Sequence, residues 1–283
     1  MKEYKIGFIG FGNMGSALAT AISKSDAVSE ISVYDISSVR ALGASVLTGG
    51  KSVQAEIAAD AVENADFLFL GVKPKDVYSV IFEIAPALAK NPKCTIVSMA
   101  AGVSIATIEE YYGMAMNTLG LLEDCLKSGT NPIIRIMPNT PVGICEGVVG
   151  FATDADSGVK QAFLTVMEKC GLVKEIMESE MNALTAVSGC GPAFVYSFIE
   201  GMIAGGIASG LSERDALLLT TNTLVGAAKM VELTGIEPSE LRNRVCSPGG
   251  ATIEGVKVLE ESDLFTTVKN AVIASYEKTK KLG

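Results

Sequence analysis

The chain has 283 residues, of which 48% are hydrophobic, with a formal net charge of −9 and no histidine. This length allows one large or two ordinary domains with a real core. The negative charge, without a long basic run, argues against nucleic acid and anionic membrane surfaces as partners. The missing histidine excludes a Ser-His-Asp triad, a histidine general acid and histidine metal ligands, so we expect no metal site.

Charged and polar residues interrupt every apolar run before it reaches the ~20 residues of a membrane helix. We therefore expect no membrane segment, and attribute the apolar surplus to buried strands and a subunit interface. The six cysteines are scattered, without a C-x-x-C pair, which is typical of reduced thiols. No signal-peptide pattern opens the chain, so we expect a cytoplasmic protein.

The first fifteen residues predict a dinucleotide site. Residues 5–9 are an apolar strand, glycines follow at G-x-G-x-x-G spacing, and a helix begins directly afterwards. Gly10 permits the tight turn, Gly12 lets a pyrophosphate approach the backbone, and Gly15 lets the helix pack close to the strand. The helix start would offer free N–H groups to the phosphates. The alternative is an ordinary glycine turn between a strand and a helix.

Residues 30–35 read as the second strand, which ends at Asp35, 20 residues beyond Gly15. An acidic side chain at this spacing can accept hydrogen bonds from the adenosine ribose and would repel a 2′-phosphate. Ser37 and Arg40 lie near enough in sequence to offset that repulsion. The alternative is a surface aspartate that closes a strand.

The next segments alternate between strands and helices, which predicts an α/β doubly wound sheet of the Rossmann type. Further strands are expected at residues 66–72, 94–99, 132–137, 147–152 and 172–176, with a helix near 154–170. Ligands of such sheets lie beyond the carboxyl ends of the strands. Lys73-Pro74, Ala100-Ala101-Gly102 and Met137-Pro138-Asn139 follow three of these strands.

The pattern becomes wholly helical after about residue 176, which predicts a domain boundary between 1–177 and 178–283. Helices are expected at 182–211 and 214–234. The first is rich in glycine and alanine, which suits very close packing against another helix; the alternative is a glycine-weakened segment, since each glycine costs a helix roughly 1 kcal/mol.

A second glycine-rich stretch, Cys246-Ser247-Pro248-Gly249-Gly250-Ala251-Thr252, precedes another helix. Free N–H groups at a helix start, with two flanking hydroxyls, favour binding of a small carboxylate. The alternative is a helix start capped by a serine side chain.

These two sites and the motifs between them resemble the pyrroline-5-carboxylate reductase family. The matching pieces occur in the family's order over nearly the whole chain: residues 10–15, 72–74, 98–102, 137–141, 188–193 and 247–252. The last two, Ser-Gly-Cys-Gly-Pro-Ala and Ser-Pro-Gly-Gly-Ala-Thr, are the specific ones, because general Rossmann enzymes lack them.

The resemblance implies an N-terminal NAD(P)H-binding domain and an all-helical C-terminal dimerisation domain, with an active site shared between the subunits of a homodimer. Dimers of this family commonly assemble into decamers. The implied activity is reduction of 1-pyrroline-5-carboxylate to L-proline, the final step of proline biosynthesis. Hydride would pass from the nicotinamide to an imine that can arrive already protonated, so no strong general acid is needed.

The resemblance also assigns residues. It implies Thr252, which would position the ring nitrogen, and Lys73 as catalytic-site residues. Cofactor contacts fall on Gly10, Gly12, Asn13, Met14, Gly15, Asp35, Val72, Lys73, Pro74, Ala100, Ala101 and Gly102. Substrate contacts fall on Ser247, Gly249, Gly250, Ala251 and Thr252.

The chain departs from the family pattern at four places. These are Asp35, the cysteines 190 and 246, Ala58-Ala59-Asp60 in place of a cofactor-contacting asparagine, and a long connection over residues 113–131. Another imine or β-hydroxyacid reductase is one alternative, although residues 182–211 lack the catalytic lysine of the hydroxyacid enzymes. A non-catalytic dinucleotide sensor is another, but it would need only the first glycine turn.

Overall fold

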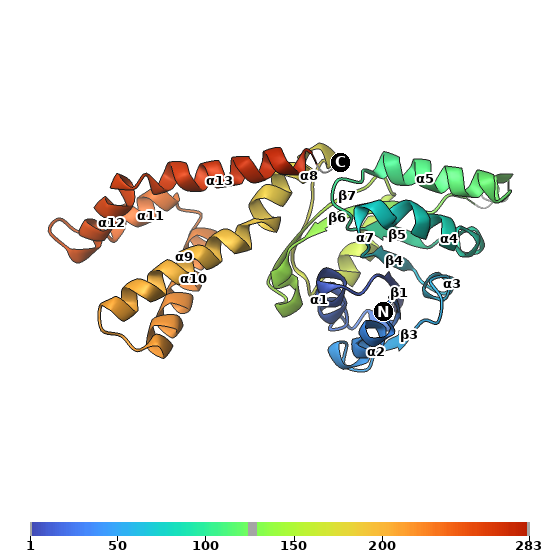
Figure 1. Cartoon of the computed structure of the whole chain (residues 1–283), viewed down its shortest axis with the longest axis horizontal. Helices are drawn as coiled ribbons and strands as arrows, with labels where there is room; N and C mark the ends of the chain where they lie inside the picture. Colours follow the sequence, from blue (N-terminus) through green and yellow to red (C-terminus); the bar gives the residue numbers. More distant parts are fainter. Residues whose placement is uncertain (1, 124–128, 282–283) are drawn as a thin grey trace. The chain divides into compact units, whose positions relative to one another are not determined.

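The computed structural model describes residues 2–123 and 129–281, so Cys125 and part of the long connection lie outside the described residues. The chain forms two compact units. Residues 1–189 and 275–283 make up the sheet unit, and residues 190–274 make up the helical unit. Figure 1 shows both units, with colours that follow the sequence.

The sheet unit is built on one eight-stranded sheet in the order β3-β2-β1-β4-β5-β6-β7-β8. The strands are β1 (Tyr4–Ile9), β2 (Val28–Tyr34), β3 (Ser52–Gln54), β4 (Phe67–Leu70), β5 (Thr95–Ser98), β6 (Ile133–Pro138), β7 (Gly147–Ala152) and β8 (Gly171–Glu175). All neighbours pair parallel except β6 and β7. The predicted doubly wound sheet is confirmed. The edge strand β3 was not predicted, because three residues are too short for a pattern.

Helices cover both faces of this sheet (Figure 1). Along β4, Phe67 and Phe69 pack with one group of helices, whereas Leu68 and Leu70 pack with the other, as the alternation of a strand dictates. The first group is α1 (Asn13–Ile22), α2 (Ser38–Leu47) and α7 (Ser157–Val166); the second is α3 (Asp60–Glu63), α4 (Val77–Lys90) and α5 (Ile105–Thr118). Both faces of the central strands are therefore buried.

The helical unit has almost no core of its own. It consists of α9 (Gly191–Ala208), α10 (Glu213–Thr234), α11 (Pro238–Arg244), α12 (Ala251–Glu261) and most of α13 (Leu264–Thr279). Within residues 190–274, only Ala216 and Thr220 are buried. Large apolar side chains such as Tyr196, Leu218 and Phe265 remain exposed.

The single helix expected over 182–211 is interrupted. The structure has α8 (Met181–Leu184), a π-helical turn η4 (Thr185–Gly189) and then α9, with Pro192 in its first turn. Proline fits the start of a helix, where its missing N–H removes no hydrogen bond, so the sequence restarts the helix there.

The expectation that no stretch is apolar enough for a membrane helix was wrong. The helical stretch Glu178–Ala208 is long and apolar enough by length and composition, because an 18-residue window within it has a mean hydropathy of 1.2. A helix that another subunit covers has the same composition, so this property alone does not indicate a membrane.

Candidate active site

The first glycine turn is built as a close approach between β1, α1 and β4. Gly10 has φ +91°, and a Cβ there would lie 2.7 Å from the carbonyl group of Gly71. A Cβ on Gly15 would lie 2.5 Å from the oxygen of Gly10. Gly12 is the N-cap of α1, with open space where its Cβ would be and no side chain capping the helix. The first N–H groups of α1 therefore remain available to an anion.

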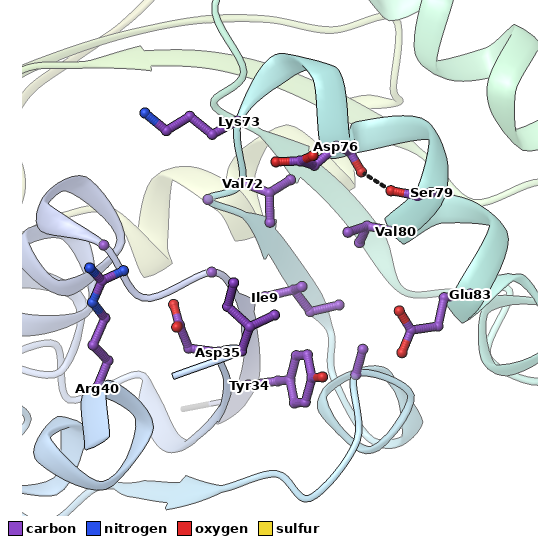
Figure 2. Close-up of a pocket in the computed structure, with 15 residues that line it drawn as sticks. Ile9, Tyr34, Asp35, Arg40, Val72, Lys73, Asp76, Ser79, Val80 and Glu83 are labelled. Carbon is purple, nitrogen blue, oxygen red and sulfur yellow. Dashed lines mark hydrogen bonds between the residues drawn. The ribbon is translucent and has the colours of Figure 1, made fainter. Parts of the chain in front are cut away.

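Asp35 holds this turn from the end of β2. Its Oδ2 accepts a hydrogen bond from the N–H of Phe11 at 2.6 Å, and its Oδ1 accepts one from the N–H of Ser37 at 2.8 Å. The carboxylate thus lies at the glycine turn (Figure 2) and is not a surface group that merely closes a strand. Its unused lone pairs can still accept from a hydroxyl.

A cavity of about 500 Å³ lies at the carboxyl ends of β1, β2 and β4. Figure 2 shows Ile9, Tyr34 and Asp35 on one side and Asp76, Val80 and Glu83 on the other. The cavity is lined by Ile9, Gly10, Gly12, Tyr34, Asp35, Ile36, Arg40, Ala58, Gly71, Val72, Lys73, Asp76, Ser79, Val80 and Glu83. Its mixture of apolar walls with a few polar groups is typical of a small-molecule site.

The cavity brings together five of the residues predicted to bind a cofactor, namely Gly10, Gly12, Asp35, Val72 and Lys73. Lys73 is exposed and begins the 3₁₀ turn η1 (Pro74–Asp76) directly after β4. The other predicted residues, Asn13, Met14, Gly15, Pro74, Ala100, Ala101 and Gly102, do not line it. The last three follow β5, at the same edge of the sheet.

Arg40 was not among the predicted site residues, although it was noted as near Asp35. It lies in the first turns of α2 and lines both the cavity and a smaller hollow of about 270 Å³, which it shares with Gly12 and Asn13. Figure 2 shows it beside Asp35. Sequence reasoning also missed Tyr34, Asp76 and Glu83, because no motif marks residues that only the fold brings to one wall.

The second glycine stretch forms a tight turn in the helical unit. The N–H of Gly250 donates to the oxygen of Ser247 at 3.0 Å, and Gly249 has φ +73°. These features, with Pro248 second, define a type II turn. Gly250 is the N-cap of α12 and no side chain caps that helix. The alternative of a serine-capped helix is therefore wrong.

Thr252 is the second residue of α12 and is exposed within the chain. The predicted substrate residues thus belong to the helical unit, whereas Lys73 and the cofactor residues belong to the sheet unit. The N–H groups at the start of α12 and the Thr252 hydroxyl provide donors suited to a carboxylate.

Five cysteines lie in the part of the chain that the structure describes. Cys94, Cys145, Cys170, Cys190 and Cys246 are free thiols. Burial is the main cause that raises the pKa of Cys94 and of Cys170 from 9.0 to about 12, so both stay protonated and unreactive at neutral pH. Across the described ranges, no three His, Cys, Asp or Glu side chains gather in a way that could hold a metal ion.

The parallel sheet, the glycine turn with its open helix start and the separate helical unit define a two-domain, dinucleotide-dependent oxidoreductase. Residues 5–102 match the family model described as NADP oxidoreductase, coenzyme F420-dependent, and residues 178–282 match that for pyrroline-5-carboxylate reductase dimerisation. The chain belongs to the pyrroline-5-carboxylate reductase family.

Similarity to individual relatives extends over the full length. The pyrroline-5-carboxylate reductase of Methanosarcina acetivorans is 35% identical, with 100% of this chain and 99% of the relative covered. That of Aquifex aeolicus is 33% identical, over 98% and 97%. A crystal structure of Plasmodium falciparum pyrroline carboxylate reductase with NADP bound has a TM-score of 0.84 and 31% identity, over 100% and 99% of the two chains.

Proposed function

We propose that this protein reduces 1-pyrroline-5-carboxylate to L-proline with hydride from NAD(P)H, the final step of proline biosynthesis. The observation that carries the proposal is the similarity to named reductases over the whole chain, which includes both glycine sites. A sensor that merely binds a dinucleotide would have no use for the second site.

The first glycine turn fits the pyrophosphate of the cofactor. Open space over Gly12 and the uncapped start of α1 allow an anion to reach the backbone N–H groups. Asp35, at the end of β2, is placed to accept from the adenosine ribose. We assign Asn13, Met14, Gly15, Val72, Lys73, Pro74 and Ala100-Ala101-Gly102 to the rest of the cofactor site.

The turn at residues 247–250 and the start of α12 fit the substrate carboxylate. Ser247, Gly249, Gly250, Ala251 and Thr252 would surround it with backbone N–H and hydroxyl donors. Charge-assisted hydrogen bonds of this kind contribute about 1.5–3 kcal/mol each. The carboxylate is the one full charge by which so small a substrate can be held.

The chemistry does not require a histidine. A cyclic imine that arrives protonated on nitrogen needs only a hydride at the adjacent carbon, and the C=N bond then becomes the C–N–H of proline. When bound, the reduced nicotinamide supplies that hydride. The protein contributes orientation, the carboxylate site and exclusion of water. The Thr252 hydroxyl oxygen would accept a hydrogen bond from the protonated ring nitrogen and thereby position the imine, and Lys73 would flank the cofactor.

We further propose a homodimer, assembled into a decamer, in the cytoplasm. The helical unit buries only two of its own side chains and exposes many large apolar ones. Exposed apolar surface on this scale is typical of an interface. The dimerisation family model spans the same region, including the apolar stretch Glu178–Ala208.

A direct assay tests the activity. Purified protein is mixed with pyrroline-5-carboxylate and either NADH or NADPH, and oxidation of the cofactor is followed together with formation of proline. We expect substrate-dependent oxidation that yields one proline per cofactor. Activity on open-chain or larger cyclic imines but not on pyrroline-5-carboxylate would favour another imine reductase instead. Tight cofactor binding without any turnover would favour the sensor.

A further inference from the structure

Residues 178–189 are the last part of the sheet unit before the chain enters the helical unit at Cys190. They comprise the 3₁₀ turn η3 (Glu178–Glu180), α8 and the π-helical turn η4. We call residues 178–189 the anchor segment, because contacts with Arg135 of β6 and with Asn139 after it hold both of its ends. None of these contacts is used by the cofactor or substrate sites described above.

The first end of the anchor segment is held by a partly buried ion pair, whose Glu178 side chain is 32% exposed. Arg135, in the middle of β6, has a side chain only 8% exposed, and its Nη1 lies 2.9 Å from Oε1 of Glu178. The same Glu178 oxygen accepts from the N–H of Ile105 at 2.8 Å. Ile105 begins α5, immediately after the loop of residues 100–104. Glu178 therefore joins β6, the start of α5 and the anchor segment.

The other end of the anchor segment is held by Asn139, which follows β6 and is 6% exposed. Its Nδ2 donates to the carbonyl oxygen of Ser188 at 3.0 Å, and its Oδ1 accepts from the N–H of Val148 at 2.8 Å. Ser188 lies in the π-helical turn η4. Such turns occur mostly at functional positions in helices, and here the side-chain amide supplies a partner to one of its carbonyls.

Apolar packing completes the attachment. Met181 and Ala186 are buried. Leu184 lies against β7 at Gly150, where any Cβ would overlap the leucine methyl groups. Beyond the anchor segment, the next buried residue is Ala216 in α10. The anchor segment therefore contains the last buried side chains before a long, partly to fully exposed stretch that begins at Cys190.

We propose that Asn139 and the Arg135–Glu178 pair are positioning residues for the reductase reaction. They hold the anchor segment at the carboxyl end of β6, and this segment leads directly into α9, the first helix of the substrate-binding unit. The proposal rests on the proposed function. Hydride transfer depends steeply on the distance and angle between the two reacting carbons, so a loosened anchor segment slows it without weakening cofactor binding.

The test compares two identical substitutions at the two ends of β6. Asn139→Asp keeps the size and the acceptor for Val148 but places an oxygen against the Ser188 carbonyl. Asn131→Asp is the matched control. Asn131 is also buried, at 5% exposure, and it donates to the oxygens of Asn91 and Cys94 and accepts from the Tyr112 hydroxyl. It precedes β6 and so lies at the amino end of that strand, whereas the anchor segment lies at the carboxyl end.

Both variants are expected to melt earlier than the wild type. Only Asn139→Asp is expected to lower kcat for pyrroline-5-carboxylate, by about 10- to 100-fold, with the Kd of NAD(P)H within twofold of the wild-type value. Glu178→Ala should behave like Asn139→Asp, and Glu178→Gln, which keeps the acceptor for Ile105, should recover most of the activity. Equal kcat in the two asparagine variants would overturn the proposal.

Amide hydrogen exchange supplies a readout that does not depend on turnover. Asn139→Asp should speed exchange in residues 181–189 relative to both the wild type and Asn131→Asp. Unchanged exchange there would overturn the anchoring even if activity fell. If the wild type failed to reduce pyrroline-5-carboxylate, the proposed function would fail and the positioning role with it, whereas faster exchange would still establish the attachment itself.

Discussion

The carboxylate of Asp35 accepts the backbone N–H of Phe11 at 2.6 Å, so the acidic residue at the end of β2 and the glycine turn form one structure. In the cofactor site proposed above, this negative charge faces the adenosine ribose and would repel a 2′-phosphate there. Two like charges at a partly desolvated site cost ~1–3 kcal/mol. We therefore predict that NADH is used at least as well as NADPH. The measurement is kcat/KM for both cofactors, and a tenfold preference for NADPH would refute this role of Asp35.

Two substitutions separate the contributions of the charges at this site. Asp35→Ala should shift the ratio of kcat/KM values toward NADPH by about tenfold or more, since the repulsion is removed. Arg40→Ala should shift it toward NADH, because this change removes a cation that lines both hollows at the glycine turn. If both variants shifted the ratio of kcat/KM values in the same direction, they would act through the stability of the turn and not through charge.

Thr252→Ala is predicted to lower kcat/KM for the substrate by roughly 10- to 100-fold, with cofactor affinity unchanged. The hydroxyl caps nothing, because Gly250 is the N-cap of α12 and no side chain caps it, so the melting temperature should stay the same. Ser212→Ala is the control: Ser212 caps α10 by accepting from the N–H of Asp215 at 3.1 Å, and its loss should cost about 1 kcal/mol of stability without affecting turnover. A Thr252→Ala variant that melts early but turns over normally would contradict this assignment.

The two glycines of this turn should respond for different reasons. Gly250 has φ −81°, which any residue can adopt, so a side chain there does not conflict with the backbone angles. A Cβ at Gly250 would lie 3.2 Å from the Ser247 oxygen, and Gly250→Val should abolish activity by filling the space for the carboxylate. Gly249, with φ +73°, is the position that requires glycine. Gly249→Ala should therefore lower both the melting temperature and kcat/KM.

The helical unit is predicted to fold only as part of a homo-oligomer whose interface exceeds ~2,000 Å². Leu218→Asp, on the exposed surface of α10, should dissociate the protein and abolish activity. Val46→Asp, at an apolar position of α2 in the sheet unit that is 85% exposed against 57% for Leu218, is the control and should change neither. Sedimentation velocity at micromolar concentration measures the oligomeric state of both variants, and the reductase assay measures their activity. A wild-type monomer with full activity would contradict the prediction.

The buried thiols predict a loss of stability at alkaline pH. The folded pKa of Cys94 is raised to about 12 from 9.0, so the unfolded thiol ionises first as the pH rises. The contribution of the buried thiol to the free energy of unfolding is complete below pH 9. It disappears between pH 9 and 12, at about 1.4 kcal/mol per pH unit. The free energy of unfolding of Cys94→Ala should thus fall less steeply above pH 9 than that of the wild type or of Cys246→Ala. Parallel slopes would rule out this contribution.

The sequence by itself determined the elements with a strong local pattern. The strand, glycine turn and helix at the amino terminus, the alternation of strands and helices, and the change to an all-helical region are written in glycine spacing and apolar periodicity. The resemblance in the motifs also placed the chain in its family. These features could be predicted because each depends on neighbouring residues only.

The tertiary structure decided what depends on distant residues. The Asp35 carboxylate accepts hydrogen bonds from two backbone N–H groups, and Arg40, Asp76 and Glu83 line the cavity. These residues meet because separate strands end at one edge of the sheet. Asn139 meets Ser188 across 49 positions of the chain. The edge strand β3 escaped prediction because its three residues are too short to carry a pattern. The helix expected at 182–211 is interrupted where Asn139 contacts the π-helical turn and Pro192 begins a new helix.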